Sequence, residues 1–148
     1  MSDEDFSEVI ATNLTGSYRM ARRATRTMLR ARWGRLIFVS SVVGLLGSAG
    51  QVNYAASKAG LIGMARSMAR ELGSRSITAN IVSPGPVATE MFASLTEEQQ
   101  SAITNQVPLG RVAQPEEIAQ TIAFLASESA AYISGAVIPI DGGLGMGH

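Results

Sequence analysis

Four successive apolar residues at positions 36–39 constrain the fold of this chain more than any other feature. The run reads Leu-Ile-Phe-Val and lies between two long stretches in which apolar residues recur at helical spacing. A strand with one face in water alternates polar and apolar residues, whereas a strand covered on both faces is apolar throughout. The run therefore predicts a buried strand in a parallel sheet.

The stretches around this run predict an alternation of helices and strands. Apolar positions from Phe6 to Met28 fall on one helical face, and Pro84 with Pro86 should end the second strand because proline has no N–H for the ladder. This order indicates an α/β fold with a parallel sheet, and the lack of repeats or linkers indicates one domain over residues 1–148. We expect a helix from Ser2 or Asp3 to Gly34, a strand at 36–39, a glycine-rich loop at 44–50, a helix at 52–72 ended by Gly73, a strand at 76–82, a loop at 83–86, a short helix at 95–106, a helix at 115–127 and a strand at 136–140.

The composition excludes several classes of function. The 148 residues include 12 basic and 12 acidic side chains, so bulk charge does not favour a nucleic acid partner. There is no cysteine, which excludes disulfides, zinc ribbons and thiol catalysis. The one histidine, His148, is the last residue, and we interpret it as part of the chain terminus and not as a catalytic residue or a ligand. Without an apolar run of about 20 residues or a cluster of carboxylates, we expect no membrane span and no metal site. The acidic N-terminus is unlike a signal peptide, so we expect a cytoplasmic protein.

Tyr54 and Lys58 form the first candidate catalytic pair. Residues four apart stand on the same face of a helix, one turn from each other. A phenol ionises only near pH 10, roughly, and a cation nearby favours its ionised form. Lys58 is the only lysine in a chain with 11 arginines, and a compact ammonium is not interchangeable with a guanidinium. On its own this spacing is a weak signal, which a chance pair on a solvated face explains better than catalysis does.

Ser41 adds a third group to this pair. It lies just beyond the carboxyl end of the strand at 36–39, and in parallel sheets that end faces the ligand crevice. A glycine-containing loop joins Ser41 to Tyr54, 13 residues later. We expect Ser41 to hold a substrate oxygen by hydrogen bonding while Tyr54 moves the proton.

Taken together, these motifs resemble the short-chain dehydrogenase/reductase family. The resemblance covers essentially all 148 residues, in the family's order, and implies a Rossmann-like doubly wound parallel sheet. The matching segments are Asn13-Leu14, Ser40-Ser41-Val42, Tyr54-Ala55-Ala56-Ser57-Lys58, Pro84-Gly85 followed by Val87 and Thr89, Tyr132-Ile133-Ser134-Gly135, and Asp141-Gly142-Gly143.

The resemblance implies a role for each residue of the candidate site. Tyr54 would be the general acid that protonates a carbonyl oxygen, Ser41 would hydrogen-bond that oxygen, and Lys58 would contact the nicotinamide ribose and favour ionisation of Tyr54. Asn13 would bend its helix and hold a water that links Lys58 to solvent. The hydride would come from the cofactor. The nicotinamide, with its carboxamide at the backbone of Val87, would be lined by Pro84, Gly85, Val87 and Thr89.

Within the family, the chain resembles the 3-oxoacyl-acyl-carrier-protein reductases, especially those of actinobacteria. This resemblance implies reduction of 3-oxoacyl thioesters in fatty-acid synthesis, with NADPH expected as cofactor and NADH as the alternative, by a homo-oligomer. An acidic acyl carrier protein, or a coenzyme A thioester, would dock near the site entrance, where Arg32 and Arg75 occupy matching places. A solvated surface position without any docking role explains each of these arginines at least as well. The resemblance rests on Gln51-Val52-Asn53-Tyr54, Lys58-Ala59-Gly60 and the ending Gly142-Gly143-Leu144-Gly145-Met146-Gly147-His148.

The dinucleotide fingerprint of the family is absent from this chain. A T-G-x-x-x-G-x-G turn normally follows the first strand, but this sequence begins at the long helix. We therefore expect the C-terminal portion of the fold only, without the opening βαβαβ unit that holds the pyrophosphate. Gly44, Gly47 and Gly50 have a different spacing and belong to the substrate-side loop of the family. We expect the strand at 36–39 to have an open apolar edge, and the chain alone to bind dinucleotide poorly.

Two other functions remain open at this point. A non-catalytic assembly module, or a fragment that associates with a full-length paralogue, would use the helices around 14–28 and 54–72, which pair across subunits in the family. An alcohol, sugar or steroid dehydrogenase of the same family would share the chemistry, because the segment at 88–106 does not reveal a substrate.

Overall fold

The computed structural model describes residues 1–146, so Gly147 and His148, including the histidine interpreted above, lie outside the described residues. Within residues 1–146, one sheet has the strand order β1-β2-β3, and both pairings are parallel. The α/β class with a parallel sheet is confirmed. The strands are β1 (Gly34–Val39), β2 (Ile77–Pro84) and β3 (Val137–Ile140).

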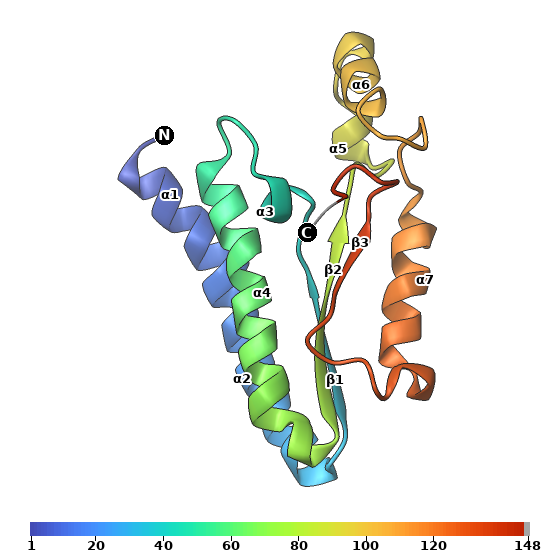
Figure 1. Cartoon of the computed structure of the whole chain (residues 1–148). Coiled ribbons are helices and arrows are strands. Elements are labelled where there is room, and N and C mark those ends of the chain that lie inside the picture. Colours follow the sequence, from blue (N-terminus) through green and yellow to red (C-terminus); the bar gives the residue numbers. More distant parts are fainter. Residues whose placement is uncertain (147–148) are drawn as a thin grey trace.

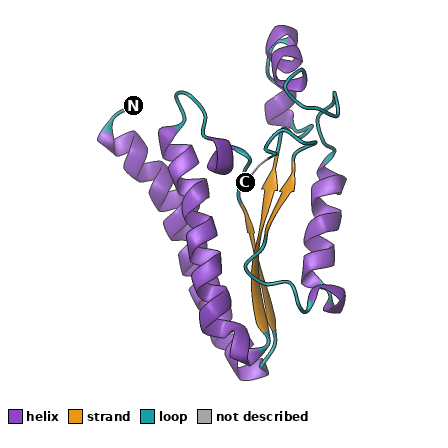
Figure 2. Cartoon of the chain, in the orientation of Figure 1, coloured by secondary structure: helices purple, strands orange, loops and turns teal. Residues whose placement is uncertain are grey.

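Helices lie on both faces of this sheet (Figure 1). One face carries the long helical segment at 3–31 and the helix at 52–72. The helix at 115–126 covers the other face (Figure 2). None of the described helices is both long and apolar enough to cross a membrane. The helices are α1 (Asp3–Ile10) and α2 (Gly16–Ala31), joined by a π-helical turn (Ala11–Thr15), then α3 (Val43–Leu46), α4 (Val52–Leu72), α5 (Glu90–Ala93), α6 (Glu97–Thr104) and α7 (Pro115–Ala126).

The central strand β2 organises the hydrophobic core. Every residue of β2 except Pro84 is buried, because β1 and β3 flank the strand and helices cover both of its faces. Alternate side chains of a strand point to opposite faces. Ile81 therefore packs in the cluster shared with α4, whereas Val82 packs with Leu125 of α7. The cluster on the α4 side consists of Ala21, Leu36, Phe38, Leu61, Ala65, Leu72, Ile77, Ala79 and Ile81.

The two glycines expected to end helices, Gly34 and Gly73, have different outcomes in the structure. Gly34 does not end the first long segment; the left-handed residue there is Arg32, with φ of 52°, and Gly34 opens β1. Gly34 is needed for close packing, since an added Cβ would lie 2.5 Å from the sulfur of Met28. Gly73 does end α4 as predicted, but with a right-handed φ of −57°; it begins a 3-10 turn, which the chain leaves at Ser76, with φ of 58°.

The second strand and the following helix also need correction. The strand does not stop at 82 but runs to Pro84. At this last position the missing N–H removes one ladder bond, while the Pro84 carbonyl still accepts from the Val42 N–H at 2.9 Å. The short helix expected at 95–106 is present as α6, which begins after Thr96 because the Thr96 hydroxyl accepts from the Gln99 N–H, whereas α5 before it was not predicted. The helix expected at 52–72 coincides with α4.

Replacing Leu61 by alanine tests how strongly α4 anchors the core. Leu61 is 1% exposed, and we expect the Leu61→Ala variant to lose about 3 kcal/mol of unfolding free energy because the cavity does not close fully. The measurement is a urea titration followed by circular dichroism. Ser67→Ala, at an exposed position of the same helix, is the control and should change the free energy by less than about 0.5 kcal/mol. Equal losses in both variants would contradict the packing of α4 on the sheet.

Candidate active site

The carboxyl end of β1 meets the first turns of α4 at a buried serine. Ser40 is 3% exposed, and its N–H donates to the Val82 carbonyl at 2.8 Å. Its hydroxyl donates to the Lys58 carbonyl at 2.9 Å. This bond holds the segment after β1 beside the helical turn that carries Tyr54 and Lys58.

Close packing of these two segments depends on Gly44. A Cβ at Gly44 would lie 2.9 Å from the Cβ of Lys58 and 3.0 Å from the backbone nitrogen of Ala59. Gly47 and Gly50 have φ angles of 77° and 78°, in the left-handed region that favours glycine. Packing and turn geometry thus account for all three glycines without a bound phosphate.

Lys58 lies beside Tyr54 on α4, as their spacing predicts. The ammonium nitrogen is 5.6 Å from the centre of the Tyr54 ring. The same nitrogen donates to the Val39 carbonyl at 2.9 Å. Burial lowers the pKa of Lys58 from its usual value, because the charged form loses hydration. The site therefore combines a phenol with a fixed, partly desolvated cation, which is an arrangement suited to proton transfer.

Asn13 contacts the helical turn of α4 that carries Tyr54 and Lys58, although it lies far earlier in the chain. It lies in the π-helical turn between α1 and α2, a geometry that interrupts the regular helical ladder. Its side-chain amide donates to the Ser57 hydroxyl at 3.1 Å, and that hydroxyl donates to the Tyr54 carbonyl at 2.7 Å. Asn13 is thus connected to the Tyr54–Lys58 turn through one buried hydroxyl, while its role in holding a water stays a prediction.

Ser41 is half-buried at the end of β1. Its hydroxyl oxygen accepts from the Val43 N–H at 3.2 Å, at the start of α3. A serine hydroxyl has one proton to donate and two lone pairs that accept. Ser41 can therefore accept this bond and still donate its proton to a ligand oxygen.

The loop after β2 lies against the segment that carries Ser41. The Val42 N–H donates to the Pro84 carbonyl at 2.9 Å. A Cβ at Gly85 would lie 2.8 Å from the Cα of Asp141. Gly85 therefore allows the carboxyl ends of β2 and β3 to approach closely, and the start of this loop stays next to the end of β1.

Val87 lies between two hydrogen bonds to one neighbouring residue. The Ala113 N–H donates to the Pro86 carbonyl at 3.0 Å, and the Ala113 carbonyl accepts from the Ala88 N–H at 2.8 Å. In such a parallel bridge the N–H and carbonyl of the middle residue point away from the partner strand. The backbone groups of Val87 are therefore directed away from Ala113. Thr89 uses its hydroxyl to cap α5.

Arg32 and Arg75 lie at the opposite end of the sheet. Arg32 shortly precedes β1 and Arg75 shortly precedes β2, whereas Tyr54 lies in the first turn of α4 (Figure 1). A helix of 21 residues such as α4 spans about 30 Å at ~1.5 Å per residue. Because α4 runs back from the carboxyl ends of the strands to their amino ends, both arginines lie far from Tyr54 of their own chain, and their role in docking stays a prediction.

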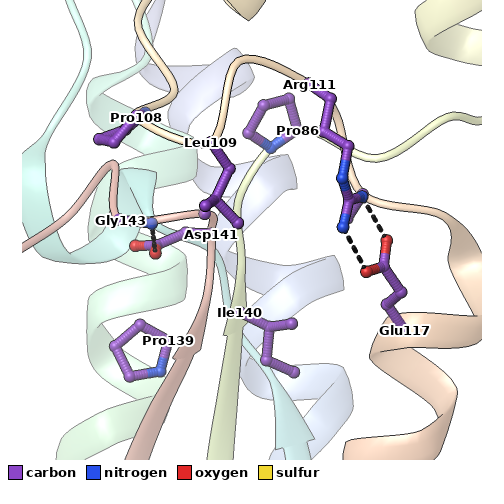
Figure 3. A pocket seen from close by; sticks show the side chains of 11 residues that line it. Pro86, Pro108, Leu109, Arg111, Glu117, Pro139, Ile140, Asp141 and Gly143 are labelled. Atoms are coloured by element: carbon purple, nitrogen blue, oxygen red, sulfur yellow. Dashed lines mark hydrogen bonds and ion pairs between the residues drawn. The ribbon is translucent and has the colours of Figure 1, made fainter.

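A pocket of about 470 Å³ lies beside the ends of β2 and β3, next to α7 (Figure 3). At its rim, Arg111 Nη1 and Nη2 pair with Glu117 Oε2 and Oε1 at 2.7 and 2.8 Å. These bonds, together with the Gln114 N–H that Glu117 accepts at 2.8 Å, lower the pKa of Glu117 to about 2. The sequence predicts Glu117 in the first turn of a helix, but the pairing was missed because Arg111 precedes the periodic segment. Apolar residues that line the pocket include Pro86, Leu109 and Ile140.

Asp141 is a buried carboxylate. It belongs to the matching segment Asp141-Gly142-Gly143, for which the sequence suggested no role. It is 8% exposed, and its two oxygens accept from the N–H groups of Gly143 and Gly145 at 3.0 and 2.9 Å. Gly142, between Asp141 and Gly143, has φ of 65°, and a Cβ there would lie 2.5 Å from Val107. Asp141 thus holds residues 142–145 in a turn beside the pocket.

Comparisons with known proteins agree with this arrangement. A model for short-chain dehydrogenases, described as Enoyl-(Acyl carrier protein) reductase, matches residues 1–145. The chain belongs to the short-chain dehydrogenase/reductase family. The resemblance inferred from the motifs of the sequence is therefore confirmed.

Curated relatives include reductases from several bacteria. The chain is 55% identical over 148 residues to 3-oxoacyl-acyl-carrier-protein reductase MabA of Mycobacterium tuberculosis (strain ATCC 25618 / H37Rv). It is 51% and 47% identical over 146 residues to the FabG proteins of the same description from Pseudomonas aeruginosa and Escherichia coli (strain K12). These matches cover 99–100% of this chain, and the chain spans 59–60% of the length of the relatives.

Replacing Glu117 by glutamine tests the ion pair at the rim of the pocket. The pKa of Glu117 is about 2 in the folded protein against 4.5 for the free group. The folded state therefore gains stability above the higher value and loses this contribution as the pH falls toward the lower one. We expect the urea midpoint to fall more steeply between these two pH values for the unmodified chain than for Glu117→Gln. Glu116→Gln, in the same helical turn, should keep the steep slope; identical slopes for all three proteins would contradict the pairing.

Proposed function

We propose that this chain supplies the catalytic groups for the NADPH-dependent reduction of 3-oxoacyl thioesters to 3-hydroxyacyl thioesters in fatty-acid synthesis. The observation that carries the proposal is the Tyr54–Lys58 pair beside the carboxyl end of β1, held there by the Ser40–Lys58 hydrogen bond. The names of the relatives support the substrate class, since MabA and FabG are described as 3-oxoacyl-acyl-carrier-protein reductases.

In this reaction the carbonyl carbon gains a hydride and the carbonyl oxygen gains a proton. The reduced nicotinamide, when bound, supplies the hydride. Tyr54 donates its phenolic proton to the oxygen, and Lys58, 5.6 Å from the ring centre, stabilises the phenolate that remains. Ser41 donates a hydrogen bond to the same oxygen and so fixes the carbonyl beside the phenol. Asn13 supports this geometry through the buried hydroxyl of Ser57.

The residues near the strand ends suit the nicotinamide end of the cofactor. The N–H and carbonyl of Val87, directed away from Ala113, form the donor and acceptor pair that a carboxamide requires. Lys58 would contact the ribose, and Pro84 with Gly85 would lie against the ring. Thr89 contributes through its backbone, because its hydroxyl caps α5. NADH is the alternative cofactor, since these residues do not contact the part in which NADH and NADPH differ.

We further propose that the thioester arrives on acyl carrier protein or coenzyme A. Residues 1–148 would act as one domain of a cytoplasmic homo-oligomer, or of an assembly with a full-length paralogue. A single sheet shared by β1, β2 and β3 within residues 1–146 supports the single domain. Arg32 and Arg75 are not proposed as docking residues for the site of their own chain, because the length of α4 separates them from Tyr54.

Replacing Tyr54 by phenylalanine tests the proton transfer. We expect Tyr54→Phe to lower the rate of NADPH oxidation with acetoacetyl-coenzyme A by about 100-fold or more, because the proton donor is removed. Tyr132→Phe removes a hydroxyl from a fully exposed tyrosine and should keep the rate. Faster turnover of a sugar, polyol or steroid ketone would favour the alternative dehydrogenase. No turnover of any of these by the unmodified chain, alone or co-expressed with the part of MabA that lies outside the match, would favour a non-catalytic assembly module.

Titration with NADPH, followed by nicotinamide fluorescence, tests how much of the cofactor the described residues can hold. We expect weak binding without saturation by the purified chain, because the T-G-x-x-x-G-x-G turn that holds the pyrophosphate in the family does not occur in residues 1–146, and the glycines before α4 serve packing and turn geometry. Any residual binding should decrease further in Lys58→Met and persist in Arg66→Met, an exposed position lower on α4. Tight saturable binding by the chain alone would contradict this expectation.

A further inference from the structure

The pocket of about 470 Å³ beside α7 lies apart from the proposed catalytic groups. Within residues 1–146, its lining contains none of the four residues assigned to proton transfer or its support, Asn13, Ser41, Tyr54 and Lys58. Ala113 lines the pocket, whereas the backbone groups of Val87 are directed away from Ala113. One stretch of backbone, residues 86–88, therefore separates the pocket from the proposed position of the nicotinamide.

The walls of this pocket are held by contacts within the chain. Loop 107–113 is joined to α7 by the ion pair described above and to the turn after β3 by the Leu109 N–H, which donates to the Gly142 carbonyl at 3.2 Å. Three lining residues are prolines, whose rings restrict the φ angle: Pro86, Pro108 and Pro139. Because the walls are fixed before a ligand arrives, a ligand loses little free energy in ordering them.

Apolar side chains face this pocket (Figure 3). Leu109 and Ile140 line it together with the three prolines, and Leu109 leaves 67% of its surface exposed. The volume lies within the range of about 300–1,000 Å³ that is usual for pockets that bind small molecules. Transfer of an apolar group from water onto these side chains is favourable, so the lining selects a ligand with an apolar part.

The Arg111–Glu117 pair gives the pocket one polar side, and both side chains remain partly exposed. Three of the five N–H groups of Arg111 are engaged, two by Glu117 and one by the Val112 carbonyl, so the guanidinium can still donate to a ligand. Glu117 Oε1 accepts one hydrogen bond and can accept another. The pair as a whole is neutral. A charged ligand would therefore be attracted by one partner and repelled by the other, while it lost part of its hydration.

We propose that this pocket binds a neutral aliphatic amide at a site separate from the catalytic groups. The chain of the amide lies against Leu109, Ile140 and the prolines, and its head bonds to the ion pair. An amide suits this pair because its carbonyl oxygen accepts from Arg111 while its N–H donates to Glu117. The ligand is thus selected by an apolar cleft with a neutral pair of donor and acceptor at its side.

Calorimetric titration of the unmodified chain with octanamide tests the proposal. We expect saturable binding of one molecule per chain. Octanoate and octylammonium have the same tail but a charged head, and each should bind at least about 10-fold more weakly. Butanamide keeps the head but buries four fewer methylene groups, and it should also bind at least about 10-fold more weakly. Equal binding of octanamide and octanoate, or no saturable binding of octanamide, would overturn the proposal.

Two pairs of variants separate the tail of the ligand from its head. Leu109→Asp places a charge in the apolar lining and should weaken octanamide binding at least about 10-fold, whereas Met91→Asp, at an exposed apolar position outside the lining, should not. Glu117→Gln leaves the charge of Arg111 unbalanced, so octanoate should bind this variant at least about 10-fold more tightly than it binds the unmodified chain. Glu116→Gln, in the same helical turn, should leave octanoate binding unchanged. The proposal fails if the two members of either pair behave alike.

A measurement on the unmodified chain covers the case in which a variant fails to fold. The backbone N–H signals of Leu109 and Gly143 should shift in NMR spectra as octanamide is added, and that of Arg75, at the opposite end of the sheet, should not. Shifts at Tyr54 in place of Leu109 would put the amide at the catalytic groups and overturn the proposal. Self-association in sedimentation velocity that Leu109→Asp abolishes would also overturn it and would assign the pocket to a second copy. None of these measurements requires cofactor or substrate, so their outcome is independent of the proposed activity.

Discussion

Burial of β2 from all sides is the constraint on which the other features depend. A parallel strand whose two faces are covered is buried along its length, and β2 is buried from Ile77 to Ser83 even at its polar residues Thr78 and Asn80. Satisfying this requirement places α4 on one face and α7 on the other, with β1 and β3 at the sides. The buried side chain of Asn80 fits the same scheme, because its amide bonds the backbone of Ile133 and Ala136 and so joins β2 to the segment before β3.

The candidate active site is a consequence of this layering. In a parallel sheet the chain must leave each strand at the same end, so three loops converge there without any direct pairing in the sequence. Ser40 and Gly44 then bring the loop after β1 against α4, which sets Lys58 beside the strand end. Lys58 itself bonds to the Val39 carbonyl on the free edge. The cation of the site and the unpaired edge of the sheet are therefore adjacent, which links the integrity of the sheet to the position of the proposed catalytic groups.

Local signals predicted most of the elements, and the errors have identifiable causes. The period of α4 and the apolar run of β1 were sufficient because both patterns are long and uninterrupted. Pro84 misled the prediction because a missing N–H matters only where a neighbouring carbonyl needs it, and the end of a strand tolerates the loss. Gly34 was wrongly read as a helix end, because Arg32 adopts the left-handed conformation before it, whereas Gly73 ends α4 without adopting that conformation. Local sequence does not report whether a glycine is required for its φ angle or for close packing.

The sequence by itself determined the α/β class, the order of the elements, the shared face of Tyr54 and Lys58, and the family resemblance, because each follows from spacing along one segment. The tertiary structure alone decided which distant groups meet. It joined Arg111 to Glu117, connected Asn13 to Tyr54 through Ser57, placed Arg32 and Arg75 far from Tyr54 of the same chain, and left a groove between α2 and β1. These contacts depend on how layers of helices and strands with unequal spacings stack, and no pattern within a single segment carries that information.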